Sequence, residues 1–150
     1  MCSKIDYNKD IDSIKEIWKK YHKKESCKKL IEEVECSRNE TYINEKDGEV
    51  KAFLTIRNKN VQDDKTNYIF EFYAVEIRKG YGRKLLEKMQ DEREFLVLHV
   101  KKTNSDVVKR YEKYGFQING KNQDGSKYCM VWRKSVKRSD GLKGGGIVLG

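Results

Sequence analysis

The chain has 150 residues, of which 37% are hydrophobic and 38% are charged, so it has the length of one ordinary domain and is too short for two independent cores. Nine tyrosines, five phenylalanines and two tryptophans supply the large apolar side chains that a disordered polyelectrolyte lacks. A formal net charge of +9 concentrates anions near the surface, but it does not choose among phosphorylated ligands, nucleic acid and acidic proteins.

The sequence also indicates the cellular compartment. No apolar stretch approaches the roughly 20 residues of a membrane span, and the first residues lack the apolar segment of a secretory signal. The four cysteines have the spacing of neither a zinc site nor a disulfide framework. We therefore expect a cytoplasmic or nuclear protein with reduced thiols, no metal and no membrane partner.

The first third of the chain predicts a strand, two helices and a hairpin. Residues 4–7 alternate as a short opening strand does, and residues 11–21 place five large apolar side chains on one helical stripe, with Asp10 or Asn8 as the N-cap. A similar stripe predicts a second helix over residues 27–36. Two strands, at residues 41–44 and 50–56, flank Asp47-Gly48, a dipeptide typical of a tight hairpin.

The rest of the chain alternates strands and helices. After a polar loop over residues 58–66, residues 68–75 are apolar on both faces except at Glu71, which predicts a central strand. Helices are predicted at residues 80–90 and 104–114, separated by a strand at 94–100. Strands at 116–118 and 127–133, around a polar loop at 119–126, complete the fold.

This order, β-α-α-β-β-β-α-β-α-β-β, predicts a single-domain three-layer α/β/α sandwich with a mixed sheet, because strand-helix-strand crossovers in the second half favour parallel pairing. We expect the domain to span residues 1–136. Residues 137–150, which are basic and rich in glycine, are expected to form a flexible tail.

The turn after residue 75 has the composition of an anion site. Glycines at 80 and 82 allow the backbone to approach a phosphate, and the start of the following helix presents unpaired N–H groups. Arg78, Lys79 and Arg83 add positive charge. An ordinary strand-to-helix turn is the alternative, because the full phosphate-binding and dinucleotide-binding motifs are missing.

A second segment makes the anion site more specific. Residues 104–116, NSDVVKRYEKYGF, closely resemble the N-x-x-A-x-x-[hydrophobic]-Y-x-x-[hydrophobic]-G-F helix of the GNAT superfamily of acetyl-CoA-dependent N-acetyltransferases. The family's earlier turn, [Q/R]-x-x-G-x-G/A, matches at both small positions, although Ile77 stands where Gln or Arg is expected. The resemblance spans about residues 71–131 and implies the splayed central sheet of acyl-CoA N-acyltransferases.

The resemblance implies a site for acetyl-CoA. The pantetheine arm would bond to backbone groups of the strand ending at Val75, with the thioester near Ala74 and Val75. The pyrophosphate would rest on N–H groups of residues 79–83, and Asn104 would contact the cofactor arm. The implied cofactor-binding set is Tyr73, Ala74, Val75, Arg78, Lys79, Gly80, Tyr81, Gly82, Arg83 and Asn104.

The same resemblance implies acetyl transfer by direct attack of an amine, which requires an acid and a base. A free amine has a pKa of ~10.4, so direct attack on the thioester requires a base. Glu71, the only carboxylate inside the predicted central strand, is the candidate base, with a cross-strand partner for lysine as the alternative role and Glu76 as a second candidate. Tyr111 is expected to protonate the leaving thiolate, and a backbone N–H near Val75 to stabilise the oxyanion.

Two other functions remain open from the sequence. One is a basic nucleic-acid-binding module, which the net charge and the tyrosines favour although no nucleic-acid motif is present. The other is a CoA-binding relative without turnover. The acceptor amine is expected to lie between residues 11–36 and the 119–127 loop, and protein lysines, protein N-termini, polyamines and drug-like amines all remain candidates.

Overall fold

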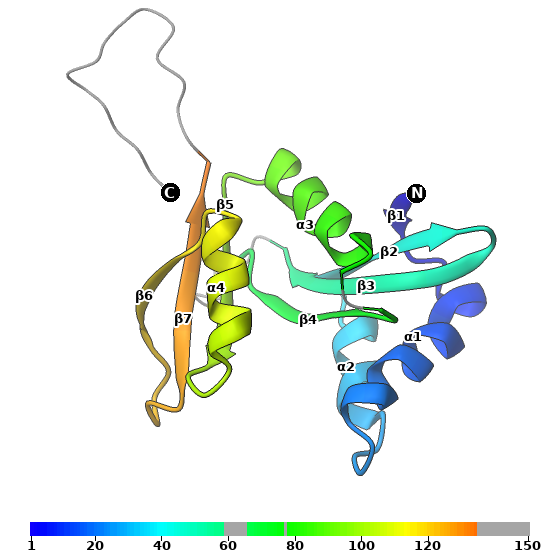
Figure 1. Ribbon diagram of the computed structural model, residues 1–150. Helices are drawn as coiled ribbons and strands as arrows, with labels where there is room; N and C mark the ends of the chain where they lie inside the picture. Colours follow the sequence, from blue (N-terminus) through cyan, green and yellow to red (C-terminus); the bar gives the residue numbers. More distant parts are fainter. Residues whose placement is uncertain (59–65, 77, 135–150) are drawn as a thin grey trace, which may run out of the picture. The chain divides into compact units, whose positions relative to one another are not determined.

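The computed structural model describes residues 1–58, 66–76 and 78–134 in two compact units, residues 1–91 and 92–150 (Figure 1). The observed order of elements is the predicted one. Most of the predicted 58–66 loop, the turn residue Ile77 and the predicted tail lie outside the described residues.

The first unit is built on a four-stranded sheet. Its order is β1 (Cys2–Lys4), β2 (Asn39–Lys46), β3 (Glu49–Arg57) and β4 (Ile69–Ala74), and each neighbouring pair is antiparallel. Asp47 and Gly48 form the predicted two-residue turn, with φ of 54° and 79°. The opening strand lies earlier than predicted, at β1, and β4 is an edge strand of this sheet rather than a central one.

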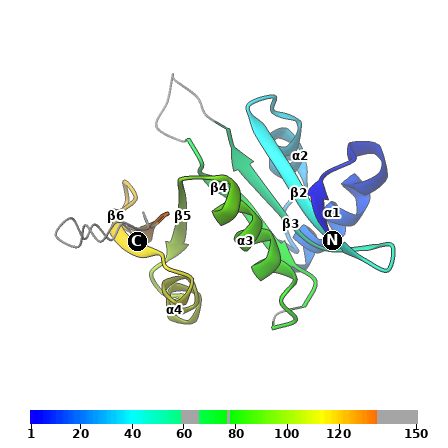
Figure 2. The same ribbon diagram turned by 90° about the horizontal axis from the view of Figure 1, so that it is seen from above.

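Helices cover both faces of this sheet, which gives the three layers expected (Figure 2). α1 (Tyr7–Tyr21) and α2 (Lys28–Glu35) lie on one face, and α3 (Tyr81–Glu92) lies on the other. The core under α1 and α2 consists of Ile14, Ile17, Trp18, Leu30, Ile43, Val50 and Phe53. On the α3 side, Asn44 donates a hydrogen bond to the carbonyl of Tyr81 at 3.0 Å.

The start of α1 differs from the prediction. The helix begins at Tyr7, with Asp6 in the N-cap position, so neither Asp10 nor Asn8 is the N-cap. Asp10 nevertheless secures the first turn from within it, because its Oδ2 accepts the backbone N–H of Asp6 at 2.9 Å. The apolar stripe marks only the buried part of the helix, and the first turn precedes it.

The second unit is a three-stranded antiparallel sheet with one helix. β5 (Phe95–Lys101), β7 (Lys127–Arg133) and β6 (Gln117–Lys121) lie in that order, and α4 (Ser105–Lys113) connects β5 to β6. A Cβ added at Gly115, just after α4, would lie 3.0 Å from the ring of Trp132 on β7. β6 takes up residues 119–121 of the predicted polar loop and is exposed along its length.

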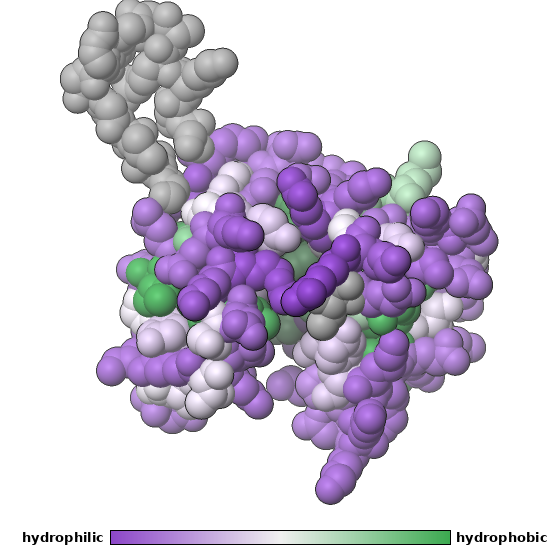
Figure 3. Space-filling model, in the orientation of Figure 1, coloured by the Kyte–Doolittle hydropathy of each residue, from purple (hydrophilic) through white to green (hydrophobic). Residues whose placement is uncertain are grey.

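Every strand pairing among the described residues is antiparallel, so the hydrogen-bonded parallel pairing expected from the crossovers does not form there. The four cysteines are free. Within the described residues, no helix combines the length and apolarity needed to cross a membrane. Hydrophilic side chains dominate the face shown in Figure 3, as the composition leads one to expect.

Candidate acetyl-transfer site

The register of β4 determines which of its backbone groups face away from β3. The N–H of Val75 donates to the carbonyl of Lys51 at 2.8 Å, which makes Val75 and Lys51 a hydrogen-bonded pair. By alternation, Glu71 and Tyr73 also bond to β3, whereas the N–H and C=O groups of Phe72 and Ala74 point to the outer edge. The N–H of Val75 is therefore committed to the sheet, and Ala74 supplies the outward-facing N–H nearest to it.

The last turn of α1 reaches the end of β4. The hydroxyl of Tyr21 donates to the carbonyl of Ala74 at 2.7 Å, and the ammonium of Lys20 donates to the carbonyl of Val75 at 2.9 Å. These bonds satisfy the two carbonyls at the point where β4 leaves the sheet. The end of the strand is thereby fixed in position by side chains of the first helix.

The glycine turn leads directly into α3. Gly80 has φ of +81° and Arg78 has φ of +74°, so the chain reverses through two left-handed residues. The first helical bond runs from the N–H of Lys84 to the carbonyl of Gly80 at 3.1 Å. The N–H groups of residues 81–83 precede this bond and have no partner within the helix, so they form its positive end.

The chemistry around this turn fits an anionic group. A Cβ at Gly82 would lie 3.3 Å from the ring of Phe72, so the helix start packs closely on β4. The first turn of α3 contains no acidic residue. Arg78 and Lys79 are exposed, and Arg83 pairs with Glu87 at 3.4 Å. Main-chain amides, two cations and close backbone approach are what a diphosphate requires.

Glu71 is a buried carboxylate with one tryptophan for a partner. The residue is only 8% exposed, and the indole Nε1 of Trp18 lies 3.2 Å from Oε1 and 3.3 Å from Oε2, donating its N–H to the carboxylate. Burial, reinforced by the nearby charge of Glu33, raises the pKa of Glu71 to about 7. The residue opposite it on β3 is Thr55, so the alternative role as a cross-strand partner for lysine is wrong.

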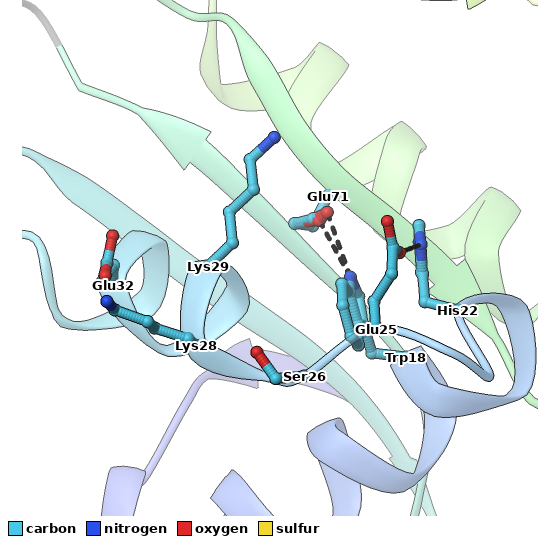
Figure 4. A pocket seen from close by; sticks show the side chains of 8 residues that line it. All are labelled: Trp18, His22, Glu25, Ser26, Lys28, Lys29, Glu32 and Glu71. Carbon is cyan, nitrogen blue, oxygen red and sulfur yellow. Dashed lines mark hydrogen bonds and ion pairs between the residues drawn. The ribbon is translucent and has the colours of Figure 1, made fainter.

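Glu71 lies on the wall of a pocket of about 470 Å³ (Figure 4). The side chains that line it come from the end of α1, the connection to α2, α2 itself and β4: Trp18, His22, Glu25, Ser26, Lys28, Lys29, Glu32 and Glu71. The first two helices, which together with the 119–127 loop are expected to frame the acceptor site, border this cavity. Glu76 is exposed and does not line it.

His22 is a wall residue that the sequence did not single out. It ends α1, and the sequence favours a solvated or packed imidazole there over a catalytic one. Its ring stacks on Trp18 with centroids 4.1 Å apart, and its Nε2 lies 2.9 Å from the hydroxyl of Tyr73. Residues 18 and 22 are one helical turn apart, so the spacing alone placed them on one face, but not beside Glu71.

The remaining predicted site residues lie on α4, in the second unit. Asn104 occupies the N-cap position and is exposed, without a side-chain capping bond. Tyr111 is half-buried and packs edge-on against Phe116, with ring centroids 5.4 Å apart. Burial raises the pKa of the Tyr111 phenol above its ordinary value, so the hydroxyl keeps its proton at neutral pH.

The site residues thus fall into two sets. Glu71, Tyr73, Ala74 and Val75 lie on or just after β4, and the turn of residues 78–83 follows in the same unit; Asn104 and Tyr111 belong to the other unit. Among the described residues, no group of three or more His, Cys, Asp or Glu side chains could hold a metal ion.

Comparison with known proteins decides the family. The model of the acetyltransferase (GNAT) family matches residues 11–116, which include β4, the glycine turn and α4. The chain belongs to the GNAT acetyltransferase family. Acetyl transfer is the general chemistry of this family, with acetyl-CoA as cosubstrate and an amine as acceptor. A search of curated proteins gives no match.

Solved structures share the GNAT fold at low sequence identity. The ribosomal-protein-S18-alanine N-acetyltransferase of Escherichia coli is 20% identical with a TM-score of 0.71, and the match covers 93% of this chain and 97% of that one. An aminoglycoside 6'-acetyltransferase type Ii is 14% identical with a TM-score of 0.71, covering 92% and 99%. A putative acetyltransferase from Salmonella typhimurium, solved with its cofactor acetyl-CoA, is 15% identical with a TM-score of 0.69, covering 93% and 96%.

Proposed function

We propose that this GNAT domain is an N-acetyltransferase that moves the acetyl group of acetyl-CoA to a primary amine by direct attack, with Glu71 as general base and Tyr111 as general acid. The observation that carries the proposal is the position of Glu71, a buried carboxylate with a pKa of about 7 on the wall of a 470 Å³ pocket. General bases work best when their pKa lies near the working pH.

Deprotonation of the amine is the task of Glu71. An alkylammonium with a pKa of ~10.4 is almost fully protonated at neutral pH and has no lone pair for attack. A carboxylate of ordinary pKa would be a weak acceptor for that proton, and the buried Glu71 is a stronger one. The amine becomes a nucleophile when its N–H bond breaks and the proton passes to Glu71.

The acetyl-CoA site is the edge of β4 together with the start of α3. The backbone of Tyr73, Ala74 and Val75 would hold the pantetheine arm, and the outward-facing N–H of Ala74 would stabilise the oxyanion. The diphosphate would rest on the amides of Gly80, Tyr81, Gly82 and Arg83, with Arg78 and Lys79 adding charge. By resemblance to the family motif, Asn104 would contact the cofactor arm and Tyr111 would protonate the thiolate.

The acceptor would enter the pocket between α1, α2 and β4. Glu25, Glu32 and Glu71 supply carboxylates to its wall, which favours a cationic amine, while Lys28 and Lys29 add positive charge. One relative is named for a protein N-terminal alanine and another for an aminoglycoside. Candidate acceptors are therefore a peptide α-amine, a lysine side chain, a polyamine and an aminoglycoside.

Two measurements test the proposal. A thermal melt should show stabilisation by acetyl-CoA, about 2.7 kcal/mol at 100 times the dissociation constant, and none by AMP. Release of free thiol should then be measured with four acceptors: a peptide beginning with alanine, an N-acetylated lysine peptide, spermidine and kanamycin. Turnover with any of them supports the proposal.

The control variant is Glu71→Gln, which should keep the acetyl-CoA stabilisation and lose turnover. Stabilisation without turnover in the wild type would favour a CoA-binding relative. Salt-dependent binding to duplex DNA with no response to acetyl-CoA would favour the nucleic-acid module and overturn the proposal.

A further inference from the structure

Three side chains form a continuous hydrogen-bonded chain from β4 to the protein surface. The hydroxyl of Tyr73 lies 2.9 Å from Nε2 of His22, and Nδ1 of the same ring contacts the carboxylate of Glu25. Tyr73 follows Glu71 by two residues, so both side chains lie on the face of β4 that α1 covers. His22 and Glu25 line the same pocket as Glu71, and Glu25 is exposed.

The carboxylate of Glu25 determines which group donates and which accepts along these hydrogen bonds. An ionised carboxylate only accepts hydrogen bonds, so Nδ1 of His22 carries the hydrogen that faces Glu25. In the neutral form of the ring Nε2 is then an acceptor, and the Tyr73 hydroxyl at 2.9 Å is placed to donate to it. Each donor points outward, from the strand to the imidazole and from the imidazole to the surface carboxylate.

Packing fixes the imidazole in this position. The ring is stacked on Trp18 at an interplanar angle of 15° and meets the ring of Tyr73 edge-on at 88°, with centroids 5.5 Å apart. Tyr21 also stacks on Tyr73, with ring centroids 5.0 Å apart. A group that moves protons needs this kind of fixed geometry, because transfer requires heavy atoms within hydrogen-bonding distance.

The reaction has a proton that Glu71 cannot accept. An ammonium group loses two protons on becoming a secondary amide, and one carboxylate holds only one of them. We propose that Tyr73, His22 and Glu25 form a proton relay that carries the second proton of the acceptor nitrogen from the site to solvent. This inference rests on the proposed function and adds a second proton path to it.

The relay moves one proton through two linked transfers. After attack, the remaining excess N–H bond breaks and its electron pair stays on nitrogen as the lone pair of the amide. The proton binds to the oxygen of Tyr73 while the phenolic proton passes to Nε2 of His22. The resulting imidazolium faces Glu25, and the proton leaves to water. The C–S bond breaks with its electron pair on sulfur, and the thiolate takes the proton of Tyr111.

Tyr73→Phe and His22→Gln test the relay, and Tyr7→Phe is the matched control. Tyr7 lies at the opposite end of α1, and its hydroxyl also donates to a glutamate, Glu35. With the acceptor that is acetylated fastest, we expect kcat to fall at least about tenfold in both relay variants, with the KM for acetyl-CoA unchanged. The control should match the wild type.

Two readouts separate proton transfer from a structural role. Added imidazole should restore turnover to His22→Ala, as a mobile base would, and it should have no effect on the wild type. In ¹⁵N spectra, Tyr73→Phe should shift the Nε2 resonance of His22, because that nitrogen loses its donor. His99→Gln assigns the spectrum, since the chain has two histidines.

The relay lies among several titratable and charged groups. Glu25 and Tyr73 contact the ring directly, and Glu71 on β4 and Lys28, Lys29 and Glu32 on α2 line the same pocket. Lys19 of α1 also binds the backbone carbonyl of Glu25.

The outcomes distinguish the relay from the proposed function. An active wild type with unchanged kcat in Tyr73→Phe, or a slow His22→Ala that imidazole does not rescue, would overturn the relay alone. A wild type that binds acetyl-CoA but acetylates none of the four acceptors would overturn the proposed function, and the relay with it.

Discussion

Trp18 donates its indole N–H to Glu71 from 3.2 and 3.3 Å, nearly midway between the two carboxylate oxygens. These residues are 53 positions apart in the chain, and their contact joins α1 to β4 at the wall of the pocket. The bond opposes the effect of burial, because a donor to a carboxylate favours the ionised form and lowers its pKa.

Trp18→Phe should therefore raise the pKa of Glu71 above its present value of about 7. A hydrogen bond to a charged group contributes roughly 1.5 kcal/mol or more, which corresponds to about one pH unit. The acidic limb of the pH profile of kcat/KM should move upward by that amount, because the ionised base is needed for turnover. Trp132→Phe, which removes the other tryptophan, should leave the limb in place. An unshifted limb in Trp18→Phe would show that Glu71 is not the group that titrates.

Glu71→Gln should make the protein more stable at alkaline pH. The folded state raises the pKa of Glu71 from 4.5 to about 7, so it binds more protons than the unfolded state between these values. The free energy of unfolding of the wild type must fall as pH rises through that window. The free energy of unfolding of the variant does not fall in this window. Above pH 7 it should exceed that of the wild type by about 3 kcal/mol at most, and below pH 4 the two should be equal. Urea denaturation at both pH values measures it, with the exposed Glu112→Gln as control.

Gly80→Ala should weaken acetyl-CoA binding, and Gly48→Ala should not. Both glycines have positive φ, +81° and +79°, and neither has any atom within 4 Å of an added Cβ. The two substitutions therefore impose the same backbone strain, about 1 kcal/mol, and should lower the stability of the free protein alike. Isothermal titration with acetyl-CoA should show at least about a tenfold loss of affinity for Gly80→Ala alone. Equal affinity in both variants would contradict a diphosphate site at this turn.

Tyr111→Phe should bind acetyl-CoA normally and turn over slowly. Its phenol is the proposed acid, and general acids contribute roughly 10² or more to rates. Tyr114→Phe is the matched control, since Tyr114 is also half-buried just after α4. Stopped-flow measurement of thiol release should show a reduced kcat only in the first variant. Equal rates in the two variants would remove Tyr111 from the mechanism.

Local patterns were sufficient for the elements of this fold and for the glycine turn. Periodicity placed the helices within a few residues, and Asp47-Gly48 specified the hairpin. The prediction that β4 is a central strand is wrong for the described sheet, because apolar residues on both faces do not require a neighbouring strand on each side. Apolar residues on both faces of a strand indicate that helices cover both faces, as α1 and α3 do here. They do not indicate which strands lie beside β4.

The pocket could be predicted only in outline. Sequence spacing shows that Trp18 and His22 share a helix face, but their partners Glu71 and Tyr73 lie about fifty residues away. Such contacts depend on how α1 packs on the sheet, and no local preference encodes them. Glu71 was found because a carboxylate interrupted an apolar strand, whereas His22, at the end of a helix rich in lysine, gave no comparable signal.

Acetyl-CoA bound along the outer edge of β4, as proposed, would also protect that edge. Pantetheine contains amide groups in an extended chain, so it can join the edge as a short extra strand would. Within the described residues β4 is the last strand of its sheet, and strand edges with outward-facing main-chain groups, such as the N–H of Ala74, promote self-association. A shortage of acetyl-CoA in the cell would then lower the solubility of this protein as well as its activity. Storage with coenzyme A should keep purified samples monodisperse.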